Sequence, residues 1–164
     1  MKILRILGRI RWNSFLSLVR ISLPNFLLLW PTYRATKDCM RISTQYFERK
    51  HYQNGPPNAF RHALWNILIA KYSYSFSSTL EKALDWAKEI TDWHEEAFFS
   101  KPLPMAMDFH NNTVGRWLFS ENFNWSNEQF IEKLLLLTQK AVKINKDSPI
   151  DQYKNQLVYI SDEH

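Results

Sequence analysis

The sequence predicts an all-α fold, a single-domain bundle of about five to six helices that opens with a basic amphipathic helix. Three observations favour this class. Apolar residues recur at helical spacing along most of the chain, glycine occurs only three times in 164 residues, and prolines and capping patterns separate the apolar stretches. A turn-rich β fold would need more glycine. With 45% hydrophobic and 15% aromatic residues, the chain can bury a substantial core.

The first fifty residues predict two helices separated by prolines. Basic and apolar residues interleave over residues 2–20, which is typical of an amphipathic helix. Pro24 and Pro31 bracket a short apolar segment, and a second helix is expected from Thr32 to about Arg49.

The middle of the chain predicts two further helices. Asn54-Gly55-Pro56-Pro57 is the strongest break, and a helix is expected from Asn58 to about Tyr74. Ser78-Thr-Leu-Glu81 has the form of a capping box and predicts a helix that reaches about Phe99.

The last third predicts two more helices and a tail. Lys101-Pro-Leu-Pro104 marks a break before a helix expected over residues 105–119. Ser126-Asn-Glu-Gln129 is a second capping box, leading into a helix over 130–144. Residues 156–160 predict a short strand or a docked extension. We therefore divide the chain into a basic amphipathic N-terminal segment (1–31), a helical core domain that carries the site (32–147) and a C-terminal tail (148–164).

Charge is unevenly distributed along the chain. Residues 1–50 carry ten Lys and Arg against two acidic residues, a net +8, so the remainder of this +5 chain nets −3. An ordinary packed helix is slightly favoured for residues 1–20, and contact with an anionic membrane surface or a partner is the main alternative. Arg20 interrupts the apolar run, so export is the weakest interpretation and stays open; we expect a cytoplasmic protein, with a peripheral position at a membrane as the alternative. No recognition motif supports nucleic-acid binding.

Three polar clusters interrupt the apolar pattern between Asn58 and Arg116. They read Asn58-Ala-Phe-Arg-His62-Ala-Leu-Trp-Asn66, Asp92-Trp-His94-Glu95-Glu96 and Met107-Asp108-Phe-His110-Asn111-Asn112-Thr-Val-Gly115-Arg116. Buried polar side chains are costly unless they satisfy one another or hold a ligand. A spacing of four residues places Asn58, His62 and Asn66 on one helix face, and likewise Asp108, Asn112 and Arg116. We therefore expect the clusters to meet in one site.

The residue types in these clusters predict a divalent metal ion, zinc or manganese. Imidazole and carboxylate groups bind such ions, so the predicted metal ligands are His62, His94 and Asp108. Glu95 is the predicted general base, and Arg116 and Asn112 are the other predicted catalytic residues, directed at a carbonyl or phosphate oxygen. The predicted substrate-binding residues are Asn58, Arg61, Asn66 and Asn111. His51 and His110 are more typical of hydrogen-bonded histidines than of ligands.

The order of histidine, histidine-acid and aspartate resembles that of HD-type phosphohydrolases, although His94-Glu95 stands where those proteins have His-Asp. The strings Asn58–Asn66, His94-Glu95 and Met107–Arg116 more specifically resemble an uncharacterised bacterial all-α domain family. Its members carry N-A-F-R-H-A-L-W-N, H-E and M-D-x-H-N-N-x-x-G-R, and the resemblance covers roughly residues 46–118. It implies a shared site and no named reaction.

These features favour a metal-dependent hydrolase of a phosphoester or another ester. A small-molecule or lipid-linked substrate is expected, met at a membrane surface through residues 1–20. Two alternatives remain open. One is a metal-free enzyme in which Glu95 works with His62 or His94 as acid and base. The other is a non-catalytic helical interaction or structural module whose polar centre is a buried network.

Overall fold

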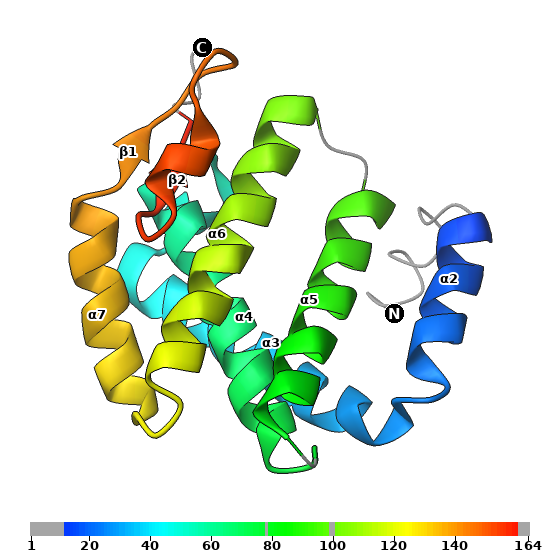
Figure 1. Cartoon of the computed structure of the whole chain (residues 1–164). Helices are drawn as coiled ribbons and strands as arrows, with labels where there is room; N and C mark the ends of the chain where they lie inside the picture. The colour runs from blue at the N-terminus through cyan, green and yellow to red at the C-terminus, as the bar shows by residue number, and fades with distance from the viewer. Residues whose placement is uncertain (1–11, 78, 99–100, 161–164) are drawn as a thin grey trace.

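The computed structural model describes residues 12–77, 79–98 and 101–160, which form a bundle of six α-helices with one very short sheet (Figure 1). The helices are α2 (Trp12–Ser22), α3 (Phe26–Phe47), α4 (Pro56–Tyr74), α5 (Leu80–Ala97), α6 (Pro102–Glu121) and α7 (Asn127–Gln139). The remaining elements are the 3-10 turns η1 (Lys50–Tyr52) and η2 (Ile150–Tyr153) and the strands β1 (Val142–Lys143) and β2 (Val158–Tyr159). The predicted all-α class is confirmed.

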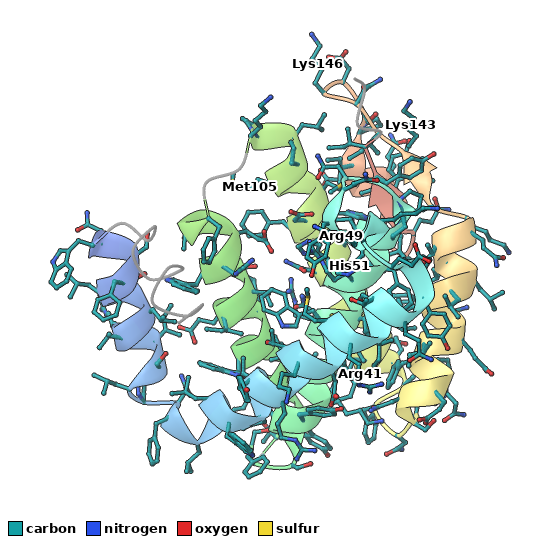
Figure 2. All side chains as sticks on the ribbon, turned by 180° about the vertical axis from the view of Figure 1, so that it is seen from behind. Arg41, Arg49, His51, Met105, Lys143 and Lys146 are labelled. Carbon is teal, nitrogen blue, oxygen red and sulfur yellow. The ribbon has the colours of Figure 1, made fainter. Side chains whose placement is uncertain are left out.

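Helix α4 is the centre of the bundle. It packs against α3, α5, α6 and α7, and Figure 2 shows α3 crossing in front of it when the molecule is seen from behind. Pro56 and Pro57 occupy its first turn, where a proline loses no intrahelical hydrogen bond. Its apolar side chains point in all directions, as a helix surrounded by others requires, and Leu64, Ile67 and Leu68 are fully buried.

Helices α4 and α6 approach each other closely at Gly115. A Cβ atom built on Gly115 would overlap the carbonyl oxygen of Ala63 and lie 2.8 Å from the Ala63 Cα. Only glycine therefore fits, and its backbone rests directly on α4. This contact brings the polar stripe of α6 against the polar stripe of α4.

Helix α3 begins before Pro31, where the sequence predicts a break. Pro31 is buried inside the helix, and its missing N–H removes one bond, to the carbonyl of Leu27. The packing of neighbouring α3 residues, including Leu28 and Ala35, on the core outweighs that loss. The predicted division between residues 31 and 32 falls within this continuous helix.

Helix α2 is the most peripheral helix. It contacts α5, where Trp93 Nε1 donates to the Ser14 carbonyl at 2.9 Å, and none of its residues is fully buried. The rest of the predicted first helix, residues 2–11, lies outside the described residues. No single helix of the described ranges is long and apolar enough to cross a membrane. Helices α2 and α3 meet that criterion only as a pair, which is bent by 112° at the break.

The C-terminal part differs from the predicted helix over 130–144. The capping box at Ser126 and Gln129 is confirmed, but α7 ends at Gln139. Val142 and Lys143 instead pair in parallel with Val158 and Tyr159, so the predicted strand in the tail finds its partner just after α7. The cap of α5 also shifts: Thr79 accepts from the Lys82 N–H, whereas predicted Ser78 lies outside the described residues.

Candidate metal and acid–base site

The polar stripe of α4 faces inward between α5 and α6. Asn58, His62 and Asn66 follow at intervals of four residues, and all three are buried. The predicted alignment of these residues is therefore confirmed. The stripe is surrounded by apolar α4 residues that hold the helix in place, so its imidazole and amides are fixed among hydrophobic neighbours.

Helix α5 contributes Glu95 and Thr91 to the same centre. Both are buried, and together with Ala87 they form a row at four-residue spacing that faces α4. His94 lies about a quarter turn away from this row. Its ring packs between Trp65 and Phe98, with centroids 5.0 and 4.7 Å away.

Helix α6 contributes Asp108 and Asn112, and the Asn112 amide links the three helices. Its oxygen accepts from Asn66 Nδ2 at 2.8 Å and lies 3.2 Å from His62 Nδ1. Its nitrogen donates to Glu95 Oε1 at 3.2 Å. Residues from all three predicted clusters thus meet in one connected centre.

The His62 ring is contacted at both nitrogens. Nδ1 lies 3.4 Å from Glu95 Oε1, and Nε2 lies 3.3 Å from Asp108 Oδ1 and 2.7 Å from Arg61 NH2. Because a guanidinium can only donate, the Arg61 contact requires a lone pair on Nε2. The proton of the neutral ring is then on Nδ1, directed at Glu95 and Asn112.

That tautomer leaves Asp108 with an unusual oxygen. Asp108 Oδ1 is buried without a hydrogen-bond partner in the described structure, although it lies close to the Nε2 lone pair of His62. Burial, together with the nearby Glu95 charge and against the attraction of His62 and Arg61, raises the pKa of Asp108 to about 6. Two lone-pair atoms thus face each other at a point where a cation or a proton would stabilise them.

The pKa values of Glu95 and His94 are both lowered, but for different reasons. Burial alone would raise the pKa of Glu95, but hydrogen bonds and charge attraction from His62, with His94 and Asn112, lower it overall. Burial lowers the pKa of His94, as do the nearby His62 and Arg61, against the opposing effect of Glu95. The centre therefore holds one carboxylate that ionises readily and one that resists ionisation.

A second layer of hydrogen bonds lies on the other side of Asn66. The Asn66 amide oxygen accepts from Arg116 NH1 at 2.7 Å and from Thr91 Oγ1 at 3.2 Å. Arg116 NH2 donates to Thr113 Oγ1 at 2.9 Å. Arg116 is predicted to hold a substrate oxygen, but its guanidinium is occupied in positioning Asn66.

Among the described residues, one histidine and two carboxylates could hold a metal ion together. One ligand atom each from His62, Glu95 and Asp108 lies within 4.8 Å of the others. The set differs from the predicted His62, His94 and Asp108, because the row through Ala87 and Thr91 directs Glu95 inward and leaves His94 against Trp65. Imidazole with two carboxylates suits zinc or manganese.

The remaining predicted residues have different positions. Arg61 is half-buried beside His62, and Asn58 is buried one turn earlier on α4, where its Oδ1 has no hydrogen-bond partner in the described ranges. Asn111 is outside the centre: its amide donates to the Val158 carbonyl and accepts from the Val158 N–H, at 2.9 and 3.0 Å. This pairing ties β2 to α6.

His51 and His110, which the sequence predicts to be hydrogen-bonded rather than ligands, each have a hydrogen-bond partner outside the centre. His51 Nε2 lies 3.1 Å from Thr44 Oγ1, close to the C-terminal end of α3 (Figure 2), and His110 Nε2 lies 2.9 Å from the Gln156 carbonyl. Sequence reasoning missed Thr91. Its spacing of four residues from Glu95 is the signal that could have identified it.

The chain belongs to the family described as "Domain of unknown function (DUF6973)", whose model matches residues 19–143. The predicted resemblance to an uncharacterised domain family is thereby confirmed. The match includes α3 to α7 and therefore every residue of the centre. No curated protein and no solved structure shows a significant match to the chain.

Proposed function

We propose that this protein is a metal-dependent hydrolase of a phosphoester or another ester, with its metal held by His62, Glu95 and Asp108. One observation carries the proposal. The Nε2 lone pair of His62 and the unpartnered Oδ1 of Asp108 point into the same space 3.3 Å apart, beside the second carboxylate, Glu95. A zinc or manganese ion would supply Lewis acidity and a water activated at neutral pH.

The surroundings of His62 support metal binding through Nε2. Metal-binding histidines usually donate their other ring N–H to a carboxylate or an amide, which fixes the tautomer and the ring orientation. The Asn112 amide oxygen is placed to accept from Nδ1, and Asn112 is itself held by Asn66. The second layer with Thr91 and Arg116 then keeps Asn66 in place.

Arg61 has a defined part in this proposal. Arg61 NH2 uses the single lone pair of His62 Nε2, so the guanidinium would have to leave that lone pair for His62 to hold a metal ion. A half-exposed guanidinium released beside the metal is suited to a phosphate or carboxylate oxygen of the substrate. This is the role that the sequence predicts for Arg61.

The test is metal content and thermal stability of the purified chain, with the neighbouring histidines as controls. Added zinc or manganese is expected to raise the melting temperature, with about 2.7 kcal/mol of stabilisation at a hundredfold excess over Kd. His62→Ala and Asp108→Asn are expected to abolish this shift, and Glu95→Gln to weaken it. His94→Ala and His110→Ala are expected to keep it. Absence of any metal effect in the unaltered chain would refute the proposal.

The alternative of a non-catalytic module also has an observation in its favour. Asn66, Asn112, Thr91 and Arg116 satisfy one another, as in a network that serves only to specify helix packing. On that alternative no metal binds and no esterase or phosphatase activity is found. Ester hydrolysis that survives chelation would instead identify the metal-free acid–base enzyme.

A further inference from the structure

An apolar corner lies at the junction of α2 and α3, far from the polar centre. We define it by six large apolar residues, Leu16, Val19, Leu23, Phe26, Leu27 and Trp30. Figure 1 shows the two helices meeting at the edge of the bundle, with α2 on its outer side. The exposed fractions of four of these side chains are 60–70%: Leu23, Phe26, Leu27 and Trp30. They form a contiguous apolar patch, whereas exposed apolar residues on most domain surfaces are scattered singly.

The corner follows from the helical spacing of the two elements. On α2, Leu18 and Ile21 pack toward the core, while Leu16 and Val19 lie on the opposite side and Leu23 follows in the turn after the helix. On α3, Leu28, Pro31 and Ala35 are buried, so the side that carries Phe26, Leu27 and Trp30 points outward. Each helix therefore has two apolar sides, one packed inward and one left uncovered by the described residues.

The charge around the corner selects the kind of surface that would cover it. Within the described residues 12–37 there are three Lys and Arg and no Asp or Glu. All three, Arg20, Arg34 and Lys37, are exposed on the same two helices. Phe26 and Leu27 also line a hollow between the corner and α5, and the α5 side of that hollow carries Asp85, Glu89 and Lys82. An apolar surface with a basic border complements an anionic lipid headgroup layer.

The aromatic residues and the bend favour a membrane over a protein partner. The ring of Trp30 stacks on that of Tyr33 with centroids 5.7 Å apart, and Trp and Tyr are the side chains enriched at membrane interfaces. The 112° bend makes the α2–α3 junction a projecting edge of the bundle. Such an edge can enter a headgroup layer, and the exposed Leu23 and Trp30 lie outside the hollow that Phe26 and Leu27 share with α5.

We propose that the apolar corner inserts into the surface of an anionic membrane and holds the bundle there as a peripheral protein. Leu23, Phe26, Leu27 and Trp30 enter the boundary of the acyl chains, and Arg20, Arg34 and Lys37 contact the headgroups. The predicted membrane contact through residues 1–20 is thereby relocated to include the start of α3. This binding does not depend on the chemistry of the polar centre.

The first experiment is co-sedimentation of the full chain with vesicles of phosphatidylcholine, with and without phosphatidylglycerol. Binding is expected to be stronger to the anionic vesicles. The double change Leu27→Ser and Trp30→Ser is expected to weaken it by about tenfold or more. The matched control is Leu136→Ser on α7, a residue 55% exposed, which is expected to bind as the unaltered chain does.

The charge contribution is tested separately with matched lysines. Lys37→Gln is expected to lower binding to anionic vesicles by about fivefold, and added salt to reduce it further. Lys146→Gln is the control, because Figure 2 shows Lys146 at the end of the molecule away from α2. Equal effects of the two lysine changes would contradict the proposed orientation.

A fluorescent label gives a readout independent of binding strength. Cys39 is buried with a pKa raised to about 12 by that burial, so Leu27→Cys introduces a selectively reactive thiol. An environment-sensitive dye at that position is expected to shift to the blue on addition of anionic vesicles, and the same dye at Leu136→Cys to remain unchanged. If the unaltered chain ignores vesicles but self-associates, and Leu27→Ser abolishes the self-association, the corner is a contact between copies and the proposal is wrong.

Discussion

His62 is contacted at both ring nitrogens. Its surroundings lower the pKa of one neighbouring carboxylate, Glu95, and raise the pKa of the other, Asp108. Glu95 faces the ring N–H and an amide, so its ionised form is stabilised. Asp108 faces a lone pair and has an oxygen without a hydrogen bond, so its ionised form is destabilised. A pair of buried carboxylates with pKa values pushed apart is typical of functional sites, because function assigns them different tasks.

This difference predicts opposite stability effects for two conservative changes in metal-free protein. The folded pKa of Asp108, about 6, is above its ordinary value of 3.8, so ionisation lowers the stability of the folded state as pH rises from 3.8 to 6, and the full cost remains at higher pH. Asp108→Asn should therefore stabilise the chain at neutral pH by up to about 3 kcal/mol, with little effect below pH 3.8. Urea unfolding in the presence of a chelator measures both.

Glu95→Gln provides the contrast. The folded state lowers the pKa of Glu95, so the ionised carboxylate stabilises the fold at pH values above its unfolded pKa. This stabilisation is lost as the pH falls through the folded pKa. The amide should destabilise the chain at neutral pH by about 1–3 kcal/mol, since a charge-assisted hydrogen bond is lost. If Asp108→Asn destabilised the protein as much as Glu95→Gln does, Asp108 would be an ordinary member of a structural network.

At the scale of the elements, the α4–α6 contact decides whether the centre exists. Asp108 and Asn112 reach His62 and Asn66 only because Gly115 lets the backbone of α6 rest on Ala63. The neighbouring Val114 and Leu118 are buried and fix the rotation of α6 about its axis. Small changes in the separation of these two helices therefore act directly on the polar centre.

Gly115→Ala should accordingly destabilise the chain by about 3 kcal/mol and impair metal binding, because the added methyl group overlaps backbone rather than a flexible side chain. Gly55→Ala is the matched control. Its Cβ would lie 3.6 Å from Pro57 Cδ, an ordinary contact, and its φ of −91° is open to alanine. Urea unfolding of both variants measures the difference, and equal midpoints would show that α6 can move away without cost.

At the scale of the whole molecule, stability is distributed unevenly around α4. The core surrounds α4, which packs on four other helices, whereas α2 packs on α5 and has no fully buried residue. Helix α4, which carries His62 and Asn66, is thus the most enclosed helix, and α2, which forms one side of the apolar corner, is the least anchored.

Native-state hydrogen exchange should show this gradient. Amides of α4 are expected to exchange only through global unfolding, and those of α2 through local opening several kcal/mol lower in free energy. Anionic vesicles should slow exchange in α2 and leave α4 unchanged, because the corner would be covered and the core is already closed. Equal protection of the two helices without vesicles would contradict this description.

Much of this architecture could be predicted from local sequence patterns. Pro56-Pro57 and the Ser126–Gln129 capping box mark real helix starts, since proline geometry and cap hydrogen bonds involve only neighbouring residues. The end of α7 could not be predicted, because residues 140–144 keep an apolar pattern and leave the helix only to pair with the tail. The break predicted at Pro31 failed for a similar reason, since distant packing outweighs one lost hydrogen bond.

The sequence by itself determined the helical class and the polar stripes of α4 and α6, because spacing along one helix sets which residues share a face. Only the tertiary structure decided which stripe members meet. In the structure Glu95, and not His94, lies with His62 and Asp108, Asn111 bonds to the tail, and Arg116 donates to Asn66. These contacts depend on the rotation of each helix against its neighbours. The tertiary structure also left the apolar side of α2 and α3 exposed, which no local pattern distinguishes from a buried one.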